Sequence, residues 1–270
     1  MPDPITWVLE ADVFPDSHAR MQEAIAEHGH TVILWSDEWW ATGRWPRLPG
    51  TRALFHGSLG NAARIQQELP WRPGAFCATD RFRCSAWYPA AKPWLLHESW
   101  VLTTVAALIA DAEAVLAPIG SPESFFVRPD SPLKPFSGRV VSRGGLSLRA
   151  LDHGFYYDDA SLPVVVAPVR PVGREWRYVV CERQLIAGSE YSAAERIAIP
   201  DDPTGAPRAF AAEIAATLSE PESVFVMDVC QTPDGLRLLE LNPFSGADLY
   251  ACDRHAVVRA VSEVASSVEV

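Results

Sequence analysis

The sequence predicts an α/β layer at the N-terminus followed by an α+β region. Three observations predict this fold class. Short apolar runs alternate with helical segments at the beginning of the chain, which is typical of parallel strands joined by helices. From Val164 onward, β-rich runs are bounded by turn signals, which is typical of antiparallel sheets. The sequence contains no internal repeat or low-complexity tract, so solenoid architectures are excluded.

The N-terminal elements follow from apolar periodicity and from two glycines. The helical pattern stops at Gly29, and the third apolar run ends at Gly57. Strands are therefore predicted at residues 5–10, 31–35 and 53–56, and helices at residues 20–28 and 61–68. This order predicts a small layer of parallel strands.

The rest of the chain begins with a helical pattern at residues 94–117, which Pro118 and Gly120 close. Pro129, Pro132 and Pro135 then mark a loop. Strands are predicted at residues 164–167, 176–181, 185–187, 224–230 and 236–241, with helices near 210–218 and 253–265. These strands and helices form the α+β region.

The composition excludes several classes of function. The chain has 270 residues, of which 48% are hydrophobic, so it can bury a sizeable core. Its 34 acidic and 23 basic residues give a formal charge of -11, and the arginines are scattered along the chain. An acidic chain without a basic stripe repels a phosphate backbone, so no nucleic-acid partner is expected. Lys92 and Lys134 are the only lysines.

The sequence also predicts a soluble, cytoplasmic protein with no membrane partner. Acidic residues within the first twenty positions exclude an apolar signal core, and no later apolar run is long enough to cross a bilayer. The five cysteines are widely spaced, without a C-x-x-C pair or a histidine at ligand spacing. They are therefore expected to be reduced, buried thiols.

A hairpin near the C-terminus is the most informative segment. Pro233, Asp234 and Gly235 predict a three-residue loop, because proline presets the first turn position and glycine suits the left-handed one. Such a loop places Asp228 directly opposite Glu240. Strand alternation then puts four residues on one face, namely Val226, Asp228, Glu240 and Asn242.

Two opposed carboxylates repel each other unless a cation or a proton offsets the repulsion. The side-chain oxygens of Asp228, Glu240 and Asn242 suit Mg²⁺ or Mn²⁺ better than Zn²⁺. The alternative is an acidic sheet face in which one carboxylate shares a proton or meets an arginine. From the hairpin alone, both interpretations stay open.

A strand that ends in a cation, followed by a polar loop, forms a candidate phosphate site. Residues 125–129 contain Arg128, and the loop at residues 130–138 contains Lys134. The sequence has neither a P-loop nor a Rossmann glycine motif. The alternative is that both cations are solvated loop charges.

In combination, these segments resemble the ATP-grasp superfamily. Arg128 and Lys134, then Glu175, then the three candidate metal ligands follow the order of that family. The phrases GREWRYVV and ELNPFSGADLY are similar to a clade of short, largely uncharacterised bacterial ATP-grasp proteins. The resemblance implies an ATP-grasp domain at residues 94–270, with a central lid at about 120–168 and a metal-binding subdomain at about 169–270. Residues 1–93 look like the preATP-grasp domain.

The resemblance implies a nucleotide site for ATP. Arg128 and Lys134 would contact its phosphates, and Glu175 would bind the ribose hydroxyls. The main chain at Val169 and Arg170 would meet the adenine edge. His97 stands near the place where many family members have a second phosphate-binding lysine, so the residue that replaces this lysine is not identified.

The resemblance also implies a catalytic centre. Asp228, Glu240 and Asn242 would hold one or two Mg²⁺ ions that bridge the phosphates. Arg177 and Lys134 would act on the transferring group, since phosphoryl transfer needs positioning and neutralised charge. The alternative for Arg177 is a salt bridge to Glu175 or to another carboxylate.

The function that this resemblance implies is an ADP-forming carboxylate-amine ligase that makes an amide or peptide bond through an acyl phosphate. Its expected partners are small-molecule or peptide substrates. No side-chain nucleophile is required, which agrees with the lack of a G-x-S-x-G motif. The alternatives are a kinase on the same fold, which yields a stable phosphorylated product, and a nucleotide-binding module without catalysis.

Candidate substrate contacts follow from position in the sequence. Ser245 and Asp248 come directly after the metal ligands, and Tyr191 is expected on the neighbouring strand. All three are therefore predicted to lie near a substrate, with loop capping as the alternative. Arg83 is a candidate for binding a substrate carboxylate, with a surface salt bridge as its alternative.

Overall fold

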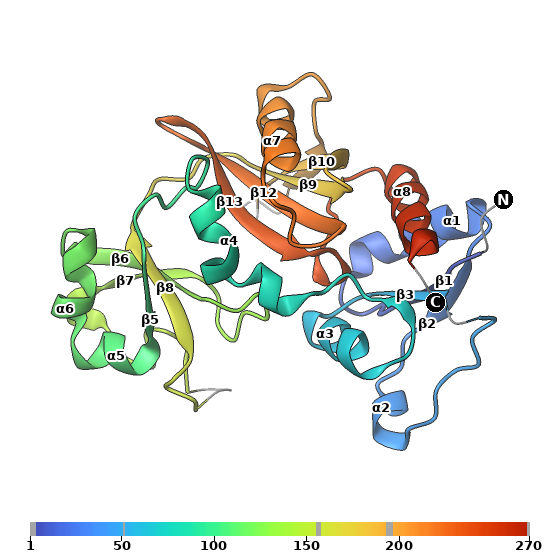
Figure 1. The fold of residues 1–270 in the computed structure, drawn as a ribbon, viewed down its shortest axis with the longest axis horizontal. Helices are drawn as coiled ribbons and strands as arrows, with labels where there is room; N and C mark the ends of the chain where they lie inside the picture. Colours follow the sequence, from blue (N-terminus) through green and yellow to red (C-terminus); the bar gives the residue numbers. More distant parts are fainter. Residues whose placement is uncertain (1–3, 51, 155–157, 193–196, 269–270) are drawn as a thin grey trace. The chain divides into compact units, whose positions relative to one another are not determined.

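The computed structural model describes residues 4–50, 52–154, 158–192 and 197–268 (Figure 1). The chain divides into two compact units, each built from separate stretches of sequence. Unit 1 comprises Met1–Ala78, Arg174–Gln231 and Leu239–Val270, and unit 2 comprises Thr79–Gly173 and Thr232–Leu238. This is a division in space, so the predicted continuous domains at residues 1–93 and 94–270 stay a prediction.

Unit 1 begins with a parallel sheet, as predicted. Its strands are β1 (Thr6–Leu9), β2 (Thr31–Leu34), β3 (Arg52–His56) and β4 (Arg72–Gly74), in the order β2-β1-β3-β4. The accompanying helices are α1 (Pro15–Glu27), α2 (Glu38–Thr42) and α3 (Leu59–Glu68). Every residue of β1 is buried, as expected for the central strand of a covered parallel sheet.

The second sheet of unit 1 has five strands in the order β11-β10-β9-β12-β13. Their bounds are β9 (Glu175–Cys181), β10 (Gln184–Ser192), β11 (Ile197–Pro200), β12 (Val224–Thr232) and β13 (Gly235–Pro243). The pairs β9–β10, β10–β11 and β9–β12 are antiparallel. The 3-10 helix η4 (Phe244–Gly246) follows β13, and the α-helices are α7 (Ala206–Thr217) and α8 (Arg254–Ser267).

One apolar core joins the two sheets of unit 1. Trp7 of β1, Val226 of β12 and Val258 of α8 belong to the same buried cluster. The Trp7 indole also donates a hydrogen bond to Ser262 of α8, with an Nε1–Oγ distance of 3.1 Å. Helix α8 therefore packs against α1 as well as against β9 and β10.

Unit 2 contains a sheet of antiparallel strand pairs in the order β5-β8-β6-β7. The strands are β5 (Val101–Thr104), β6 (Ser124–Pro129), β7 (Arg139–Ser142) and β8 (Pro163–Pro168). The α-helices are α4 (Cys84–Ala91), α5 (Val105–Ala110) and α6 (Ala112–Leu116), with 3-10 helices η1 (Thr79–Phe82), η2 (Ala117–Ile119) and η3 (Arg143–Gly145). Phe125 and Val127 of β6 face a core shared with α5 and α6.

The predicted helix at residues 94–117 is wrong in its first part. Residues 101–104 form β5, which pairs with β8, because β-branched side chains fit a pleated surface. Thr104 then caps α5 by accepting a hydrogen bond from Ala107 N, and Asp111 caps α6 in the same way from Ala114 N. The apolar spacing continued across these caps, so the pattern did not reveal them.

No helix in the described ranges is long and apolar enough to cross a membrane.

Candidate functional site

The predicted hairpin forms the start of the site. Pro233 and Asp234 connect β12 to β13, and Gly235 has a φ of 114°, a conformation that glycine adopts without strain. Asp228 lies in the middle of β12 and is only 1% exposed. On its other side, β12 pairs with β9, and this register places Asp228 opposite Arg177.

Arg177 and Asp228 form a buried, two-pronged ion pair. The guanidinium Nε donates to Asp228 Oδ1 and Nη2 donates to Oδ2, both at 2.8 Å. Asn242 Nδ2 donates a third hydrogen bond to Asp228 Oδ2, at 3.1 Å. The remaining guanidinium nitrogen, Nη1, donates to the Asp248 carbonyl at 2.8 Å. The alternative of an arginine meeting a carboxylate is therefore present, and the arginine is Arg177.

This pair is electrostatically tight. Burial alone would lower the pKa of Arg177, but the Asp228 carboxylate outweighs burial and raises that pKa well above its ordinary value. A fork-shaped guanidinium that binds both oxygens of one carboxylate is the strongest geometry for such a pair. The charge of Asp228 is thus balanced within the protein.

Glu175 and Tyr191 lie beside this pair on β9 and β10. The Tyr191 hydroxyl donates a hydrogen bond to Glu175 Oε2 at 2.8 Å. Burial raises the pKa of Glu175, although the hydrogen bond from Tyr191 works in the opposite direction. The Tyr191 ring stacks on Tyr250, with centroids 4.5 Å apart and an interplanar angle of 21°. The candidate ribose ligand is therefore held by an aromatic pair, of which the sequence pattern had indicated only Tyr191.

The predicted metal ligands fit a hard divalent cation in their chemistry. Asn242 turns its amide nitrogen toward Asp228, so its Oδ1 is directed away from that carboxylate. Asp228 Oδ1 accepts one hydrogen bond, from Arg177, and keeps a second lone pair. Glu240 is half-buried on β13. In the part of the chain that the structure describes, no three His, Cys, Asp or Glu side chains gather as a metal group, and the predicted set is two carboxylates with one amide.

The predicted phosphate cations lie in unit 2. Arg128 and Phe126 share the face of β6 that is turned away from the apolar core. The following loop returns to this face at Gly138, where an added Cβ would lie 2.7 Å from Phe126 Cζ and 3.4 Å from Arg128 Cβ. Lys134 is exposed on that loop. The close approach at Gly138 explains why glycine ends the loop.

His97 is a further residue of unit 2 with a defined environment. Its ring stacks on Phe126, with centroids 4.9 Å apart and an interplanar angle of 17°. Burial lowers the pKa of His97 to about 4, with further lowering by Arg128 and Arg170. His97 is therefore neutral at neutral pH and lies near two of the predicted nucleotide-binding residues. The only sequence signal for it was its place near an expected lysine.

The substrate candidates differ in their surroundings. Ser245 is fully buried, and its Oγ accepts a hydrogen bond from Phe76 N at 2.9 Å, so it fastens η4 to the main chain after β4. Arg83 Nη2 forms a surface ion pair with Asp80 Oδ1 at 3.0 Å. The Asp248 carboxylate accepts a hydrogen bond from Tyr250 N at 2.9 Å. These contacts match the alternatives of loop capping and salt bridging, while Tyr191 lies inside the Arg177–Asp228 cluster.

The sequence matches the model of an ATP-grasp domain family, family 2 of its clade, over residues 100–260. The chain belongs to this ATP-grasp family. The predicted resemblance and fold class are thereby confirmed. No curated protein sequence matches the chain.

Solved structures of similar fold agree with this family. D-cycloserine synthetase DcsG is 16% identical with a TM-score of 0.69, covering 97% of this chain and 100% of that chain. A RimK domain ATP-grasp protein from Sphaerobacter thermophilus is 18% identical with a TM-score of 0.59, covering 97% and 96%. The ATP-grasp ligase PsnB, complexed with a precursor variant, Mg and ADP, is 14% identical with a TM-score of 0.60, covering 99% and 100%. At these identities, the likeness concerns the fold.

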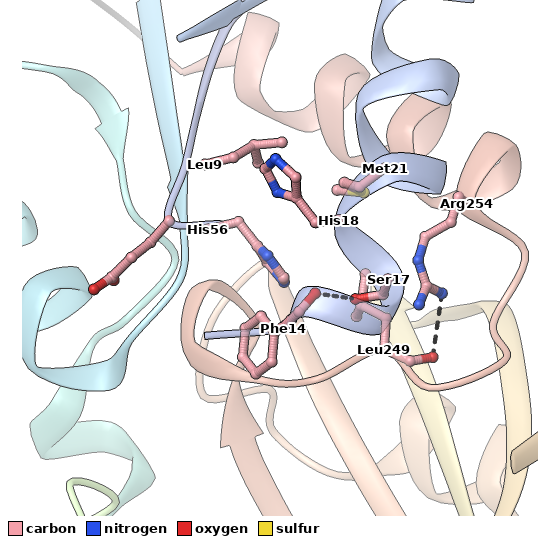
Figure 2. Close-up of a pocket in the computed structure, with 9 residues that line it drawn as sticks. Leu9, Phe14, Ser17, His18, Met21, His56, Leu249 and Arg254 are labelled. Atoms are coloured by element: carbon pink, nitrogen blue, oxygen red, sulfur yellow. Dashed lines mark hydrogen bonds between the residues drawn. The ribbon is translucent and has the colours of Figure 1, made fainter. Parts of the chain in front are cut away.

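A small cavity lies at the ends of β1 and β3 in unit 1 of this ATP-grasp chain (Figure 2). Its lining residues come from β1, β3, the segment around the start of α1 and the chain near α8: Leu9, Glu10, Phe14, Ser17, His18, Met21, His56, Leu249 and Arg254. His56 is 6% exposed, and its Nε2 lies 3.1 Å from the Ala247 carbonyl oxygen. Burial, followed by the charge of Arg254, lowers the pKa of His56 to about 4.

This buried histidine predicts a loss of stability in mild acid. The pKa of His56 is lower in the folded chain than its ordinary value of 6.5, so the unfolded chain binds the proton more tightly. Its contribution is complete above pH 6.5 and falls as the pH drops toward 4, with a loss of about 2 kcal/mol between pH 6.5 and pH 5. Urea unfolding of the wild type and of His56→Gln at both pH values measures it. An equal loss in both proteins would contradict the prediction.

Proposed function

We propose that this protein is an ATP- and Mg²⁺-dependent ligase that joins a carboxylate to an amine. In the first step, a carboxylate oxygen attacks the terminal phosphorus of ATP, the bond from that phosphorus to the bridging oxygen breaks, and ADP leaves. In the second step, the amine nitrogen attacks the carbonyl carbon of the acyl phosphate. The carbon–oxygen bond to phosphate breaks, inorganic phosphate leaves, and the nitrogen loses a proton as the amide forms.

The observation that carries this proposal is the polar cluster on the sheet of β9, β12 and β13. Strands far apart in sequence bring Glu175, Arg177, Asp228 and Asn242 together, in a chain that belongs to the ATP-grasp family. Two carboxylates, an amide and a guanidinium are suited to hold a cation and neutralise phosphate charge. Such a cluster offers no nucleophile, which agrees with a reaction whose intermediate is formed on the substrate.

In this proposal, Asp228, Glu240 and Asn242 hold Mg²⁺, which neutralises phosphate charge when it is bound. Arg177 is paired with Asp228 and stabilises the transferring group. Glu175, held by Tyr191, accepts hydrogen bonds from the ribose hydroxyls. A carboxylate positioned by a second side chain loses little freedom when it binds such a donor.

Residues of unit 2 are also assigned to the nucleotide in this proposal. Arg128 and Lys134 bind the phosphates, and the main chain at Val169 and Arg170 binds the adenine edge. Val169 is 42% exposed, and Arg170 is also exposed, so this segment is accessible to a ligand. Gly138 allows the loop that carries Lys134 to pack closely against Arg128.

The proposal predicts ADP release that depends on both a carboxylate and an amine. The protein is incubated with ATP, Mg²⁺ and a pool of amino acids and dipeptides, and nucleotides and products are separated by chromatography and mass spectrometry. ADP, phosphate and a new amide are expected in equal amounts, because each turnover makes one of each. Release of AMP, or a stable phosphorylated product without any need for an amine, would refute the ligase and favour the kinase alternative.

A further inference from the structure

Tyr250 has a backbone conformation that tyrosine seldom adopts. Its φ is 46°, in the left-handed region that favours glycine, although a glycine at this place would avoid the cost. A non-glycine residue in that region costs free energy and persists only where the surrounding structure enforces it. The contacts around Tyr250 therefore bear on why a tyrosine is placed here.

Arg254 is the main contact that enforces this conformation. The side chain is 5% exposed, and its guanidinium donates to three carbonyl groups of the loop, those of Leu249 at 3.3 Å, Tyr250 at 2.6 Å and Cys252 at 2.6 Å. Figure 2 shows the hydrogen bond from Arg254 to Leu249. Within the described ranges, no acidic side chain forms an ion pair with Arg254. A buried cation is thus committed to holding this loop.

The loop held in this way presents the Tyr250 ring to the polar cluster. The ring stacks on Tyr191, and the Arg177 guanidinium lies 4.7 Å from the Tyr250 centroid and 5.6 Å from the Tyr191 centroid. Tyr191 in turn binds Glu175, and Arg177 binds Asp228. Tyr250 is therefore one contact away from the residues proposed to hold the nucleotide and the metal.

The Tyr250 hydroxyl has a donor available for a ligand. Among the described residues it has no hydrogen-bond partner, and it is not among the buried atoms, so water reaches it. A phenol O–H beside a guanidinium is a pair of donors, and carboxylate oxygens are the natural acceptors for such a pair. Packing alone does not require the hydroxyl, because phenylalanine would stack on Tyr191 equally well.

We propose that the Tyr250 hydroxyl donates a hydrogen bond to the carboxylate oxygen of the acyl substrate, beside Arg177. Arg254 is the positioning residue that holds Tyr250 in this place. The inference rests on the proposed ligase function and adds to it the group that recognises the carboxylate. After phosphorylation, the same donor is directed at the carbonyl oxygen, which gains negative charge when the amine attacks.

The test compares Tyr250→Phe with Tyr178→Phe. Both changes remove one hydroxyl, but Tyr178 belongs to the part of β9 buried under the opposite side of the sheet and lies near Asp201 and Arg208. With the amino acid and dipeptide pool, Tyr250→Phe is expected to lower kcat/KM for the carboxylate about 10- to 100-fold, the loss of one hydrogen bond to a charged group. The Kd for Mg·AMPPNP, measured by calorimetry, is expected to stay that of the wild type. Tyr178→Phe is expected to match the wild type in both.

The outcomes separate this inference from the function on which it rests. A wild type that turns over the pool together with an equally active Tyr250→Phe overturns the role of Tyr250 alone. A wild type that binds Mg·AMPPNP but releases no ADP with any member of the pool overturns the ligase proposal, and the role of Tyr250 with it.

Arg254→Lys tests the positioning role. Lysine keeps the charge but cannot reach three carbonyl groups with one nitrogen, so kcat/KM for the carboxylate is expected to fall as in Tyr250→Phe. In the double variant, the second change is expected to add less than about threefold, because both residues act through one hydrogen bond. Fully multiplicative losses would overturn the positioning role, since two independent defects multiply.

Discussion

Arg177→Met is expected to lower the free energy of unfolding by about 3–5 kcal/mol, because it leaves a buried carboxylate without its counter-charge. Asp228 is 1% exposed, so water cannot replace the two hydrogen bonds that the guanidinium donates. Methionine fills part of the volume but donates nothing. Chemical denaturation followed by tryptophan fluorescence measures the change.

Two further variants show whether charge is the cause. Arg143→Ala removes the exposed ion pair with Glu123 and is expected to change stability by no more than about 1 kcal/mol. Adding Asp228→Asn to Arg177→Met is expected to recover about 1–3 kcal/mol, because a neutral amide costs less to bury than an unpaired carboxylate. A double variant less stable than Arg177→Met would show that packing, and not charge, sets the loss.

The sequence predicted the carboxylate face well because local signals determine it. Pro233 and Gly235 mark the turn, and alternation along β12 and β13 puts Asp228 and Asn242 on one face, as their hydrogen bond confirms. The direct opposition of Asp228 and Glu240 stays a prediction. Parallel strands at the N-terminus were equally accessible, since each is a short apolar run ending near a glycine or a polar loop.

The partner of Asp228 was not accessible in this way. Arg177 lies 51 residues earlier, and only the pairing of β9 with β12 brings the two together. A single sequence contains no signal for which strands are neighbours, so the alternatives for Arg177 stayed open. The strain at Tyr250 and the loop contacts of Arg254 depend on the same long-range packing. Local patterns therefore predicted the residue types of the site, and the sheet order determined their partners.

Glu240→Gln is expected to lower the rate of ADP release at least about 100-fold while the fold stays intact. Glutamine has nearly the same shape, so the half-buried side chain still fits on β13. The change removes one negative charge from the proposed metal site, where a charged oxygen binds Mg²⁺ more strongly than an amide oxygen. The loss is therefore expected to come with a higher Mg²⁺ concentration for half-maximal rate and partial rescue at high Mg²⁺ or Mn²⁺.

The metal dependence separates this role from a structural one. A residue that only supports the sheet would lower the rate without changing the Mg²⁺ concentration at which it is half-maximal. Glu263→Gln makes the same charge change on an exposed part of α8 and is expected to keep the wild-type rate and Mg²⁺ dependence. Full activity of Glu240→Gln at the wild-type Mg²⁺ requirement would remove Glu240 from the metal site and leave Asp228 and Asn242 as an internal anchor for Arg177.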